Sequence, residues 1–509
     1  MYSLASVLDQ HAQRRPGKTV VVHGDRRLTN RDLQARVDAL AHGLLDLGIG
    51  RGDVIGLLLY NHAEFLEAVF AANRIGAVFL PLNYRLAPAE WEYILGHAGA
   101  RALITESEFG AAAENLALPE LRHRITLDGA AGPSWTRLPD LVEANLGRGV
   151  PPVDTGEGEL QRLMYTSGTT SRPKGVKITN GNVIYKNLGQ IIHLGLTHAD
   201  ITLVCGPLYH VGALDLPALA TWHAGGSLVV QRKFDADEVL RAIERERITN
   251  VWLAPAMMNA VLGSAELGRR DTSSVRFIVG GGEKMPEPLV RRILEGFPNA
   301  WFADAYGLTE TVSGDTFLDR EHTLAKLGSV GRPIPHVRVR VVGEDDRDVP
   351  AGTLGEIVLR GPKVCAGYWR DEAATERAFR GGWFHTGDVG RLDEDGFLYV
   401  EDRKKDMIVS GGENIATPEV ERVLYEHPAV LEAAVVGLPH ERWGEVPRAF
   451  VVPRPGETVT AEEIQDFCRA RLARFKVPAR VELIGELPRT PSGKVLKRLL
   501  RDRPATAAP

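Results

Sequence analysis

Short apolar runs alternate with amphipathic segments along the first part of the chain. Apolar residues repeat at helical spacing over 33–44, and residues 64–75 form a second helical pattern that stops at Gly76. The apolar runs 54–59 and 77–80 are typical of buried strands. Strands that alternate with helices predict largely parallel sheets covered by helices.

The same alternation returns between residues 226 and 306. Strand-like runs at 227–230, 249–253 and 276–279 are separated by helical stretches such as 237–245. This second block predicts a second helix-covered sheet.

The pattern changes after about Ser329. Residues 337–342 and 356–360 have the character of half-exposed strands, with turn residues at Ala351 and Gly352 between them. They predict a small β-barrel-like unit that closes the large domain.

A new α/β pattern begins after Asp402. It predicts helices at 418–426 and 461–473 and a strand at 433–437. The predicted fold is therefore α/β, with a large N-terminal domain (1–404) of two helix-covered sheets plus the β-rich unit. A small mobile C-terminal α/β domain (405–509) follows it.

Composition narrows the class of protein. A chain of 509 residues predicts more than one domain, and its net charge of -5 gives no basic field for nucleic acid. No apolar run reaches the roughly 20 residues of a membrane helix, and residues 1–17 lack the apolar core of a signal peptide. The three cysteines are far apart in sequence, which suits a reducing compartment. We expect a cytoplasmic protein without a transmembrane segment.

Residues 165–176 suggest a phosphate-binding loop. Hydroxyl side chains stand there with Gly168, Gly175, Arg172 and Lys174. Small residues let backbone N–H groups approach an anion, while hydroxyls and cations complete the cradle. By composition alone the stretch could also be an exposed polar loop. It is not a Walker motif, because Pro173 occupies the fifth position after Gly168.

The loop resembles the signature of the adenylate-forming superfamily, which includes acyl-CoA synthetases, luciferases and peptide-synthetase adenylation domains. Further segments match this superfamily's motifs in order, at 207–212, 280–283, 306–310, 383–388, 402–406 and 491–494. The resemblance covers nearly the whole chain, and acyl- and aryl-CoA ligases are the most similar branch.

The resemblance implies a role for each motif residue. Tyr306 would stack on adenine, Asp388 would bind the ribose hydroxyls, and Arg403 would lie near ribose and phosphate. Thr309 would contact the α-phosphate, Glu310 would hold Mg²⁺, and Lys494 would be the catalytic lysine. The remaining ATP-binding positions would be Thr166, Ser167, Gly168, Thr169, Thr170, Lys174, Gly281, Gly282, Glu283 and Asp304.

The C-terminal motifs imply coenzyme A as the second ligand. Gly411 and Gly412 would shape the pantetheine tunnel, and Trp443 and Phe475 resemble coenzyme A contacts. The hinge about which the C-terminal domain rotates would be Lys405.

The acyl pocket of the resemblance would be formed by His210, Gly212, Met257, Gly280 and Gly307. Relatives that take acetate carry Trp where Gly307 stands, and coumarate-type ligases often carry an aromatic residue where Gly212 stands. These small residues predict a roomy pocket for a bulky, largely apolar carboxylic acid, to which methionine can adapt.

The sequence therefore predicts an ATP-dependent acid–thiol ligase that forms an acyl-adenylate and then an acyl-CoA, with ATP, Mg²⁺ and coenzyme A. One departure is Ser171-Arg172, where a glycine usually follows the two threonines. It leaves open thioester formation from a pre-formed adenylate only, and acyl transfer to a carrier protein is a further alternative. A regulatory nucleotide-binding protein and a luciferase-like oxygenase are rivals from other classes. The oligomeric state is open, with a homodimer as one option.

Overall fold

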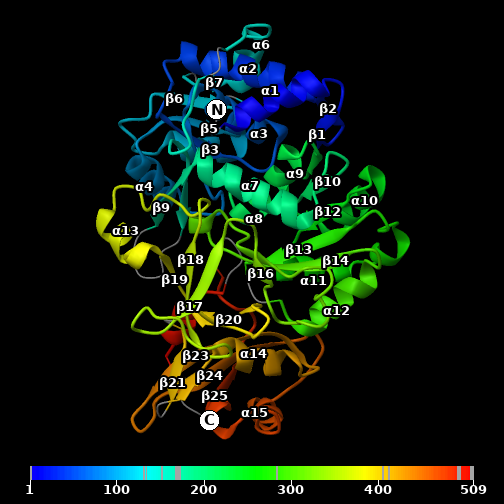
Figure 1. Ribbon diagram of the computed structural model, residues 1–509, viewed down its shortest axis with the longest axis vertical. Helices are drawn as coiled ribbons and strands as arrows, with labels where there is room; N and C mark the ends of the chain where they lie inside the picture. The colour runs from blue at the N-terminus through cyan, green and yellow to red at the C-terminus, as the bar shows by residue number, and fades with distance from the viewer. Residues whose placement is uncertain are drawn as a thin grey trace.

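The computed structural model describes residues 3–129, 132, 134–150, 153–166, 173–282, 285–403, 406–410, 413–489 and 495–504. Four sheets organise these residues (Figure 1). The first sheet has seven strands, parallel except for the last pair. In spatial order they are β7 (Thr136–Arg137), β6 (His123–Thr126), β5 (Ala100–Thr105), β3 (Val54–Leu58), β4 (Val78–Pro81), β8 (Leu160–Thr166) and β9 (Lys174–Thr179).

The second sheet has nine strands, with a parallel centre and antiparallel edges. In order they are β16 (Arg332–Pro333), β15 (Thr316–Phe317), β14 (Trp301–Tyr306), β13 (Phe277–Gly281), β12 (Asn250–Trp252), β10 (Ile201–Val204), β11 (Ser227–Val230), β1 (Thr19–His23) and β2 (Arg26–Thr29). The predicted arrangement of largely parallel sheets is confirmed.

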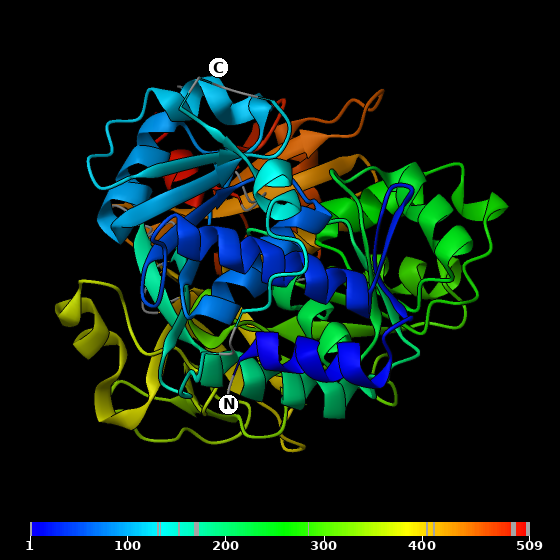
Figure 2. The ribbon, with the colours of Figure 1, turned by 90° about the horizontal axis from the view of Figure 1, so that it is seen from above.

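Helices cover both sheets and bury their apolar faces against them. They are α1 (Leu4–Arg14), α2 (Asn30–Asp46), α3 (Ala63–Ile75), α4 (Pro88–Ala98), α5 (Ser107–Glu114), α6 (Leu138–Glu143), α7 (Asn180–Leu194), α8 (Val211–Asp215), α9 (Ala218–His223), α10 (Ala236–Glu246), α11 (Pro255–Gly263) and α12 (Glu287–Gly296). Residues of the two sheets pack into one core, which includes Val21, Ile55, Phe70 and Trp222. The two sheets therefore lie side by side (Figure 2).

Local sequence signals set several helix boundaries. The Thr29 side chain accepts a hydrogen bond from the Asp32 backbone N–H, and the Asp32 carboxylate accepts one from the Thr29 N–H, which caps α2. Helix α3 ends at Gly76, whose φ of 71° is easily reached only without a Cβ. Some predicted boundaries were wrong. The strand predicted at 433–437 is β23 (Val430–His440), which is longer at both ends. Helix α15 (Ala461–Arg469) ends four residues before the predicted Ala473, and a 3-10 turn follows at Arg474–Lys476.

The β-rich unit is a four-stranded antiparallel sheet of β17 (Arg338–Val342), β18 (Gly355–Arg360), β19 (Phe384–Leu392) and β20 (Leu398–Arg403). The fourth sheet contains β22 (Glu413–Ile415), β21 (Ile408–Ser410), β24 (Gly444–Pro453), β23 (Val430–His440) and β25 (Arg480–Leu483). It forms the small C-terminal unit with α14 (Thr417–Tyr425), α15 and α16 (Lys497–Arg501), at one end of the long axis (Figure 1). Helix α13 (Glu372–Ala378) belongs to the segment between β18 and β19.

The C-terminal unit contacts the four-stranded sheet through polar side chains. Asp402, at the end of β20, accepts hydrogen bonds of 2.8 Å from both the N–H and the hydroxyl of Thr417 in α14. Arg501 pairs with Asp406 at 3.0 Å.

Among the described residues, no helix is long and apolar enough to cross a membrane.

Three charged side chains are buried between strand β8 of the first sheet and helices α7 and α8. Arg162 on β8 donates to Asp215 at 2.7 Å, and Lys186 on α7 lies 3.3 Å from the other oxygen of the same carboxylate. All three side chains have no exposed surface. Burial lowers the pKa of Lys186 to about 8, and Asp215 opposes this shift. Asp215 thus joins strand β8 to helices α7 and α8.

We predict that Asp215→Ala lowers the free energy of unfolding by about 3–5 kcal/mol, because it leaves two buried cations without a carboxylate. Denaturant titration followed by fluorescence measures the change. Asp140→Ala is the matched control, since Asp140 is 59% exposed in its pair with Arg137. It should change stability by less than about 0.5 kcal/mol. Equal effects of the two variants would contradict the role given to Asp215.

Candidate active site

The predicted phosphate segment begins at the antiparallel pair β8–β9. Thr166 and Lys174 are register partners at one end of this pair, so the two described residues that flank the predicted phosphate segment lie side by side. The Lys174 ammonium lies 5.2 Å from the ring centroid of Tyr368. The structure therefore places Lys174 beside a tyrosine that the sequence motifs do not include.

The glycine-rich segment lies at the carboxyl end of β13. Gly280 is paired with Asp304 on β14, and a Cβ at Gly280 would lie 2.2 Å from the ring of Phe302. Gly281 and Gly282 have φ angles of 152° and 94°, which favour glycine. Glycine is therefore needed at Gly280 for packing and at the next two positions for backbone conformation.

Three of the predicted nucleotide-binding residues converge. The Tyr306 hydroxyl donates to Asp388 at 2.8 Å, and the Arg403 guanidinium lies 3.1 Å from the other Asp388 oxygen. The register of β19 and β20 sets Asp388 directly opposite Arg403. Burial raises the pKa of the Tyr306 phenol well above its usual value, so the phenol stays protonated as a donor.

Glu310 lies in a 3-10 turn, Thr309–Thr311, directly after β14. The Tyr368 hydroxyl donates to the Glu310 carboxylate at 3.0 Å, and the Cys365 N–H donates to the Glu310 carbonyl at 2.7 Å. Burial raises the pKa of Glu310, while the bond from Tyr368 and the charge of Arg403 oppose that shift. A carboxylate placed in this way can hold Mg²⁺, which accepts a few carboxylates and completes its octahedron with phosphate oxygens.

A strained turn follows Thr309 and Glu310. Val312, Ser313 and Gly314 have successive φ angles of 56°, 59° and 66°. Two of these left-handed residues carry a Cβ, and valine is β-branched, so the turn costs free energy that other contacts must offset.

Lys363 supplies those contacts. Its ammonium donates to the Ser313 carbonyl at 2.9 Å and to Asp315 at 2.5 Å, and Thr311 also donates to Asp315. The Lys363 and Asp315 side chains are buried. Lys363 therefore holds the turn that positions Thr309 and Glu310.

His210 caps helix α8, and its Nδ1 accepts the Gly212 N–H at 3.0 Å. Its ring is stacked near Trp252, with centroids 5.9 Å apart and planes at 27°. Both rings line a cavity of about 50 Å³. The other lining residues are Val211, Gly212, Leu216, Gly282, Ala305, Gly307, Leu308, Thr309 and Ser313.

The expectation that Gly212 and Gly307 leave open space needs correction. A Cβ at Gly212 would lie 2.4 Å from the indole of Trp252, and one at Gly307 would lie 2.4 Å from the Gly314 nitrogen. Trp252 and the strained turn therefore fill the volume that these glycines leave. Met257 does not line the cavity and instead packs against two core clusters.

The expected coenzyme A residues lie in the C-terminal unit. Trp443 is 44% exposed and Phe475 is 39% exposed, so both rings are accessible to a ligand. Several predicted residues lie outside the described parts of the chain: Ser167, Gly168, Thr169, Thr170, Ser171, Arg172, Glu283, Lys405, Gly411, Gly412 and Lys494.

Sequence reasoning missed Trp252, Tyr368 and Lys363. Tyr368 follows a glycine and precedes Trp369, but this cluster resembles an ordinary turn. Lys363 is a single lysine between Pro362 and Val364 and belongs to no motif, so its burial could not be predicted. The apolar run at 249–253 did contain Trp252, yet only the fold turns its ring toward His210.

The strand ends of this two-part α/β chain bring Tyr306, Asp388 and Arg403 into one hydrogen-bonded group. Gly307 and Thr309, which follow Tyr306, line the cavity together with His210. This arrangement defines an enzyme of the adenylate-forming class. The chain belongs to the AMP-binding enzyme family. The profile of that family matches residues 8–369, and the profile of the AMP-binding enzyme C-terminal domain matches residues 419–494.

Relatives align over nearly the full chain. A feruloyl-CoA synthase of an Amycolatopsis species is 40% identical, covering 97% of each chain. An indoleacetate–CoA ligase of Aromatoleum aromaticum is 38% identical, covering 97% of this chain and 96% of the relative. The o-succinylbenzoate CoA synthetase of Bacillus subtilis, solved with its acyl-adenylate intermediate, is 34% identical with a TM-score of 0.86 over 98% of each chain. An anthranilate CoA ligase in complex with anthranoyl-AMP has a TM-score of 0.91 at 28% identity, covering 98% of this chain and 96% of that chain.

We predict that Lys363→Met slows acyl-adenylate formation by about 100-fold, because the turn that positions Thr309 and Glu310 relaxes. ATP–pyrophosphate exchange measures this half-reaction. The variant should also need more Mg²⁺ for half-maximal rate, a change that a general loss of folded protein would not produce.

The double variant Lys363→Met/Asp315→Asn separates charge from position. It removes the unpaired buried carboxylate, so stability should recover in part. The exchange rate should stay low, since nothing holds the Ser313 carbonyl. Full recovery of exchange in the double variant would contradict the positioning role of Lys363.

Proposed function

We propose that this enzyme is an AMP-forming acid–CoA ligase whose substrate is a bulky, largely apolar aromatic carboxylic acid. The convergence of Tyr306, Asp388 and Arg403 beside Glu310 carries the proposal. A phenol ring, a carboxylate able to accept two hydrogen bonds and a guanidinium suit adenine, a ribose diol and a phosphate. The aromatic acids of the relatives' names support the choice of substrate class.

In the first half-reaction a carboxylate oxygen of the acid attacks the α-phosphorus of ATP. A mixed carboxylic–phosphoric anhydride bond forms, the bond between the α-phosphorus and the oxygen of the leaving pyrophosphate breaks, and acyl-adenylate results. Two anions meet, so positive charge must already be in place. Lys174, Arg403 and Lys494 supply it from the protein. Mg²⁺, held by Glu310 when bound, neutralises charge on the phosphate oxygens.

In the second half-reaction the thiol of coenzyme A attacks the acyl carbonyl. A thioester forms, the carbonyl–phosphate bond breaks, and AMP leaves. Lys494, which serves the first half-reaction, and the segment of Gly411 and Gly412, which serves the second, both belong to the small domain. The small domain would therefore adopt a different orientation for each half-reaction.

We place the domain boundary at 404/405, with Lys405 as the hinge and Trp443 and Phe475 as coenzyme A contacts. The cytoplasm is the proposed compartment, and a homodimer is one assembly to test.

Half-reactions measured separately test this function. With an aromatic acid, the protein should exchange pyrophosphate into ATP and, once coenzyme A is added, release AMP and a thioester detectable by mass spectrometry. Lys494→Ala should slow exchange by about 100-fold or more while still converting supplied acyl-adenylate to thioester. Lys405→Pro should slow the thioester half-reaction, since it stiffens the hinge.

The exposed Arg498 provides a matched control, because Arg498→Ala removes a cation close to Lys494 in sequence. It should leave both half-reactions unchanged. If no acid supports ATP–pyrophosphate exchange but supplied acyl-adenylate is still converted to thioester, the proposal is wrong. The enzyme would then form thioesters only from pre-formed acyl-adenylate. Wild-type rates in Lys405→Pro would refute the hinge.

Trp252 controls the size of the acyl pocket in this proposal. The cavity of about 50 Å³ is smaller than the roughly 150 Å³ that accommodates benzene, and Trp252 is the largest of the side chains that line it. The buried Trp252 nitrogen has no hydrogen-bond partner in the described parts of the chain, so moving the indole breaks no such bond. The neighbouring lining at Gly307 is backbone, which cannot rotate aside.

We predict that Trp252→Leu raises the kcat/KM ratio of biphenylcarboxylate to benzoate by about 10-fold or more, because the removed indole leaves space for the second ring. Steady-state AMP release with the two acids gives the ratio. Trp301→Leu removes an indole from the same sheet outside the cavity and should leave the ratio unchanged. An unchanged ratio in Trp252→Leu would show that another group limits the pocket.

A further inference from the structure

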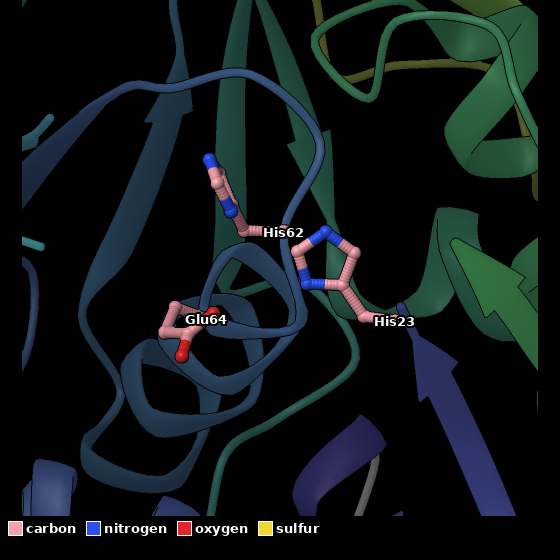
Figure 3. Close-up of side chains that lie close together, drawn as sticks. All are labelled: His23, His62 and Glu64. Atoms are coloured by element: carbon pink, nitrogen blue, oxygen red, sulfur yellow. The ribbon is translucent and has the colours of Figure 1, made fainter. Parts of the chain in front are cut away.

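A group of potential metal ligands lies away from the nucleotide-binding residues, where the first and second sheets meet. His23 is the last residue of β1, His62 directly precedes α3, and Glu64 lies in the first turn of α3. One potential ligand atom from each residue lies within 4.8 Å of the other two. The three side chains lie close together (Figure 3).

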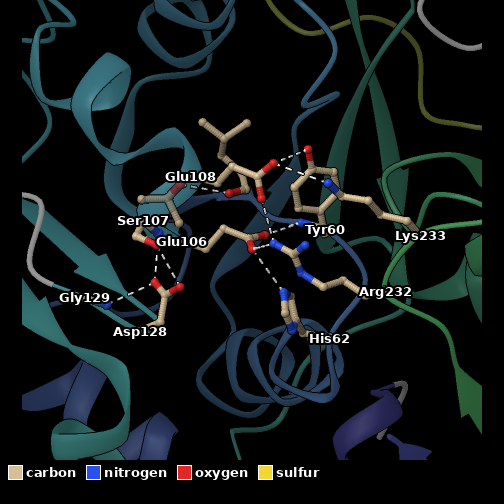
Figure 4. Close-up of polar contacts among 11 residues, drawn as sticks. Tyr60, His62, Glu106, Ser107, Glu108, Asp128, Gly129, Arg232 and Lys233 are labelled. Atoms are coloured by element: carbon tan, nitrogen blue, oxygen red, sulfur yellow. Dashed lines mark hydrogen bonds and ion pairs between the residues drawn. The ribbon is translucent and has the colours of Figure 1, made fainter.

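The two histidines have complementary orientations. Their ring centroids are 5.2 Å apart and the ring planes are nearly perpendicular, at 89°. His62 uses Nε2 for a 3.3 Å contact with Glu106, which leaves Nδ1 available on the side of His23 (Figures 3 and 4). A carboxylate on the far nitrogen is the usual partner of a metal-bound histidine, since it fixes the tautomer and orients the ring.

Glu106 is itself held in place. Its buried carboxylate accepts the Tyr60 N–H at 2.6 Å and the Arg232 guanidinium at 2.6 Å, as Figure 4 shows. These bonds fix the carboxylate that orients His62. The hydrogen bonds that would orient His62 as a metal ligand are therefore present in the structure.

Glu64 can bind a cation without losing its present partner. Arg26 donates to one Glu64 oxygen and, through its other terminal nitrogen, to Glu67 at 2.7 Å. A carboxylate offers lone pairs on both oxygens, so the second Glu64 oxygen remains available as a ligand.

The charged side chains around His23, His62 and Glu64 have no net positive charge that would repel a divalent cation. In the described ranges, the ion pairs around the group contain four carboxylates and four cations, whose formal charges cancel. They are Glu64, Glu67, Glu106 and Glu108 with Arg26, Arg36, Arg232 and Lys233.

We propose that His23, His62 and Glu64 bind one divalent transition metal ion of the zinc class. Two imidazoles and one carboxylate form a ligand set that zinc accepts, with a fourth position open to water. Mg²⁺ prefers oxygen ligands in an octahedron, so the ion that accompanies ATP would not compete for this group. Because β1 belongs to the second sheet and α3 follows β3 of the first, the ion would link the two sheets.

Zinc titration of the chelator-treated full-length protein tests the site. Isothermal titration calorimetry should show one Zn²⁺ per chain with a Kd in the low micromolar range or tighter, and Co²⁺ should give the visible absorption of a four-coordinate site. His23→Ala should weaken Zn²⁺ binding by at least about 10-fold, and Glu106→Gln should weaken it by about 10–100-fold through His62. Zn²⁺ should raise the Tm of the wild type but not of His23→Ala.

His198→Ala is the matched control, because His198 is exposed and outside the group. It should bind Zn²⁺ like the wild type. ATP–pyrophosphate exchange measured without Zn²⁺ reports whether each variant is folded, independently of metal binding. Millimolar-only binding, or equal binding by folded His23→Ala and the wild type, would overturn the proposal.

Discussion

Pairing of buried charge is the constraint on which the centre of this enzyme depends. Arg162, Lys186 and Lys363 are cations almost without access to water, and Asp215 and Asp315 lie against them. Charges can remain in such an environment only when they are paired and hydrogen-bonded. Each pairing also joins elements distant in sequence. Asp215 connects β8 with α7 and α8, and Asp315 connects the strained turn after Glu310 with the loop of Lys363.

The same geometry explains why the site lies at the strand ends. Parallel strands direct their carboxyl ends to one edge, where β13 and β14 deliver the glycine-rich segment and Tyr306. The antiparallel register of β19 and β20 then sets Asp388 beside Arg403. Segments about a hundred residues apart thus form one hydrogen-bonded group without a long loop.

Much of the fold and the motif-based part of the site could be predicted from the sequence. Apolar spacing predicted α2, α3 and the parallel strands, and Gly76 predicted the end of α3, because these signals act over a few neighbouring residues. The C-terminal boundary of α15 was missed, since no glycine or proline marks it in the sequence. The motifs predicted Tyr306, Glu310, Asp388 and Arg403 by resemblance, and the structure brings Tyr306, Asp388 and Arg403 into contact. The space at Gly212 and Gly307 could not be predicted, because it depends on which distant group fills it.

The sequence by itself determined the class of fold, the family and the types of side chain available for chemistry, since these follow from local spacing and from motifs in order. Only the tertiary structure decided that Trp252 fills the space beside Gly212. It alone decided that Lys363 is buried under a left-handed turn and that Tyr368 bonds Glu310. These contacts join residues about 40 to 60 positions apart, and packing in three dimensions, rather than any local preference, brings such residues together.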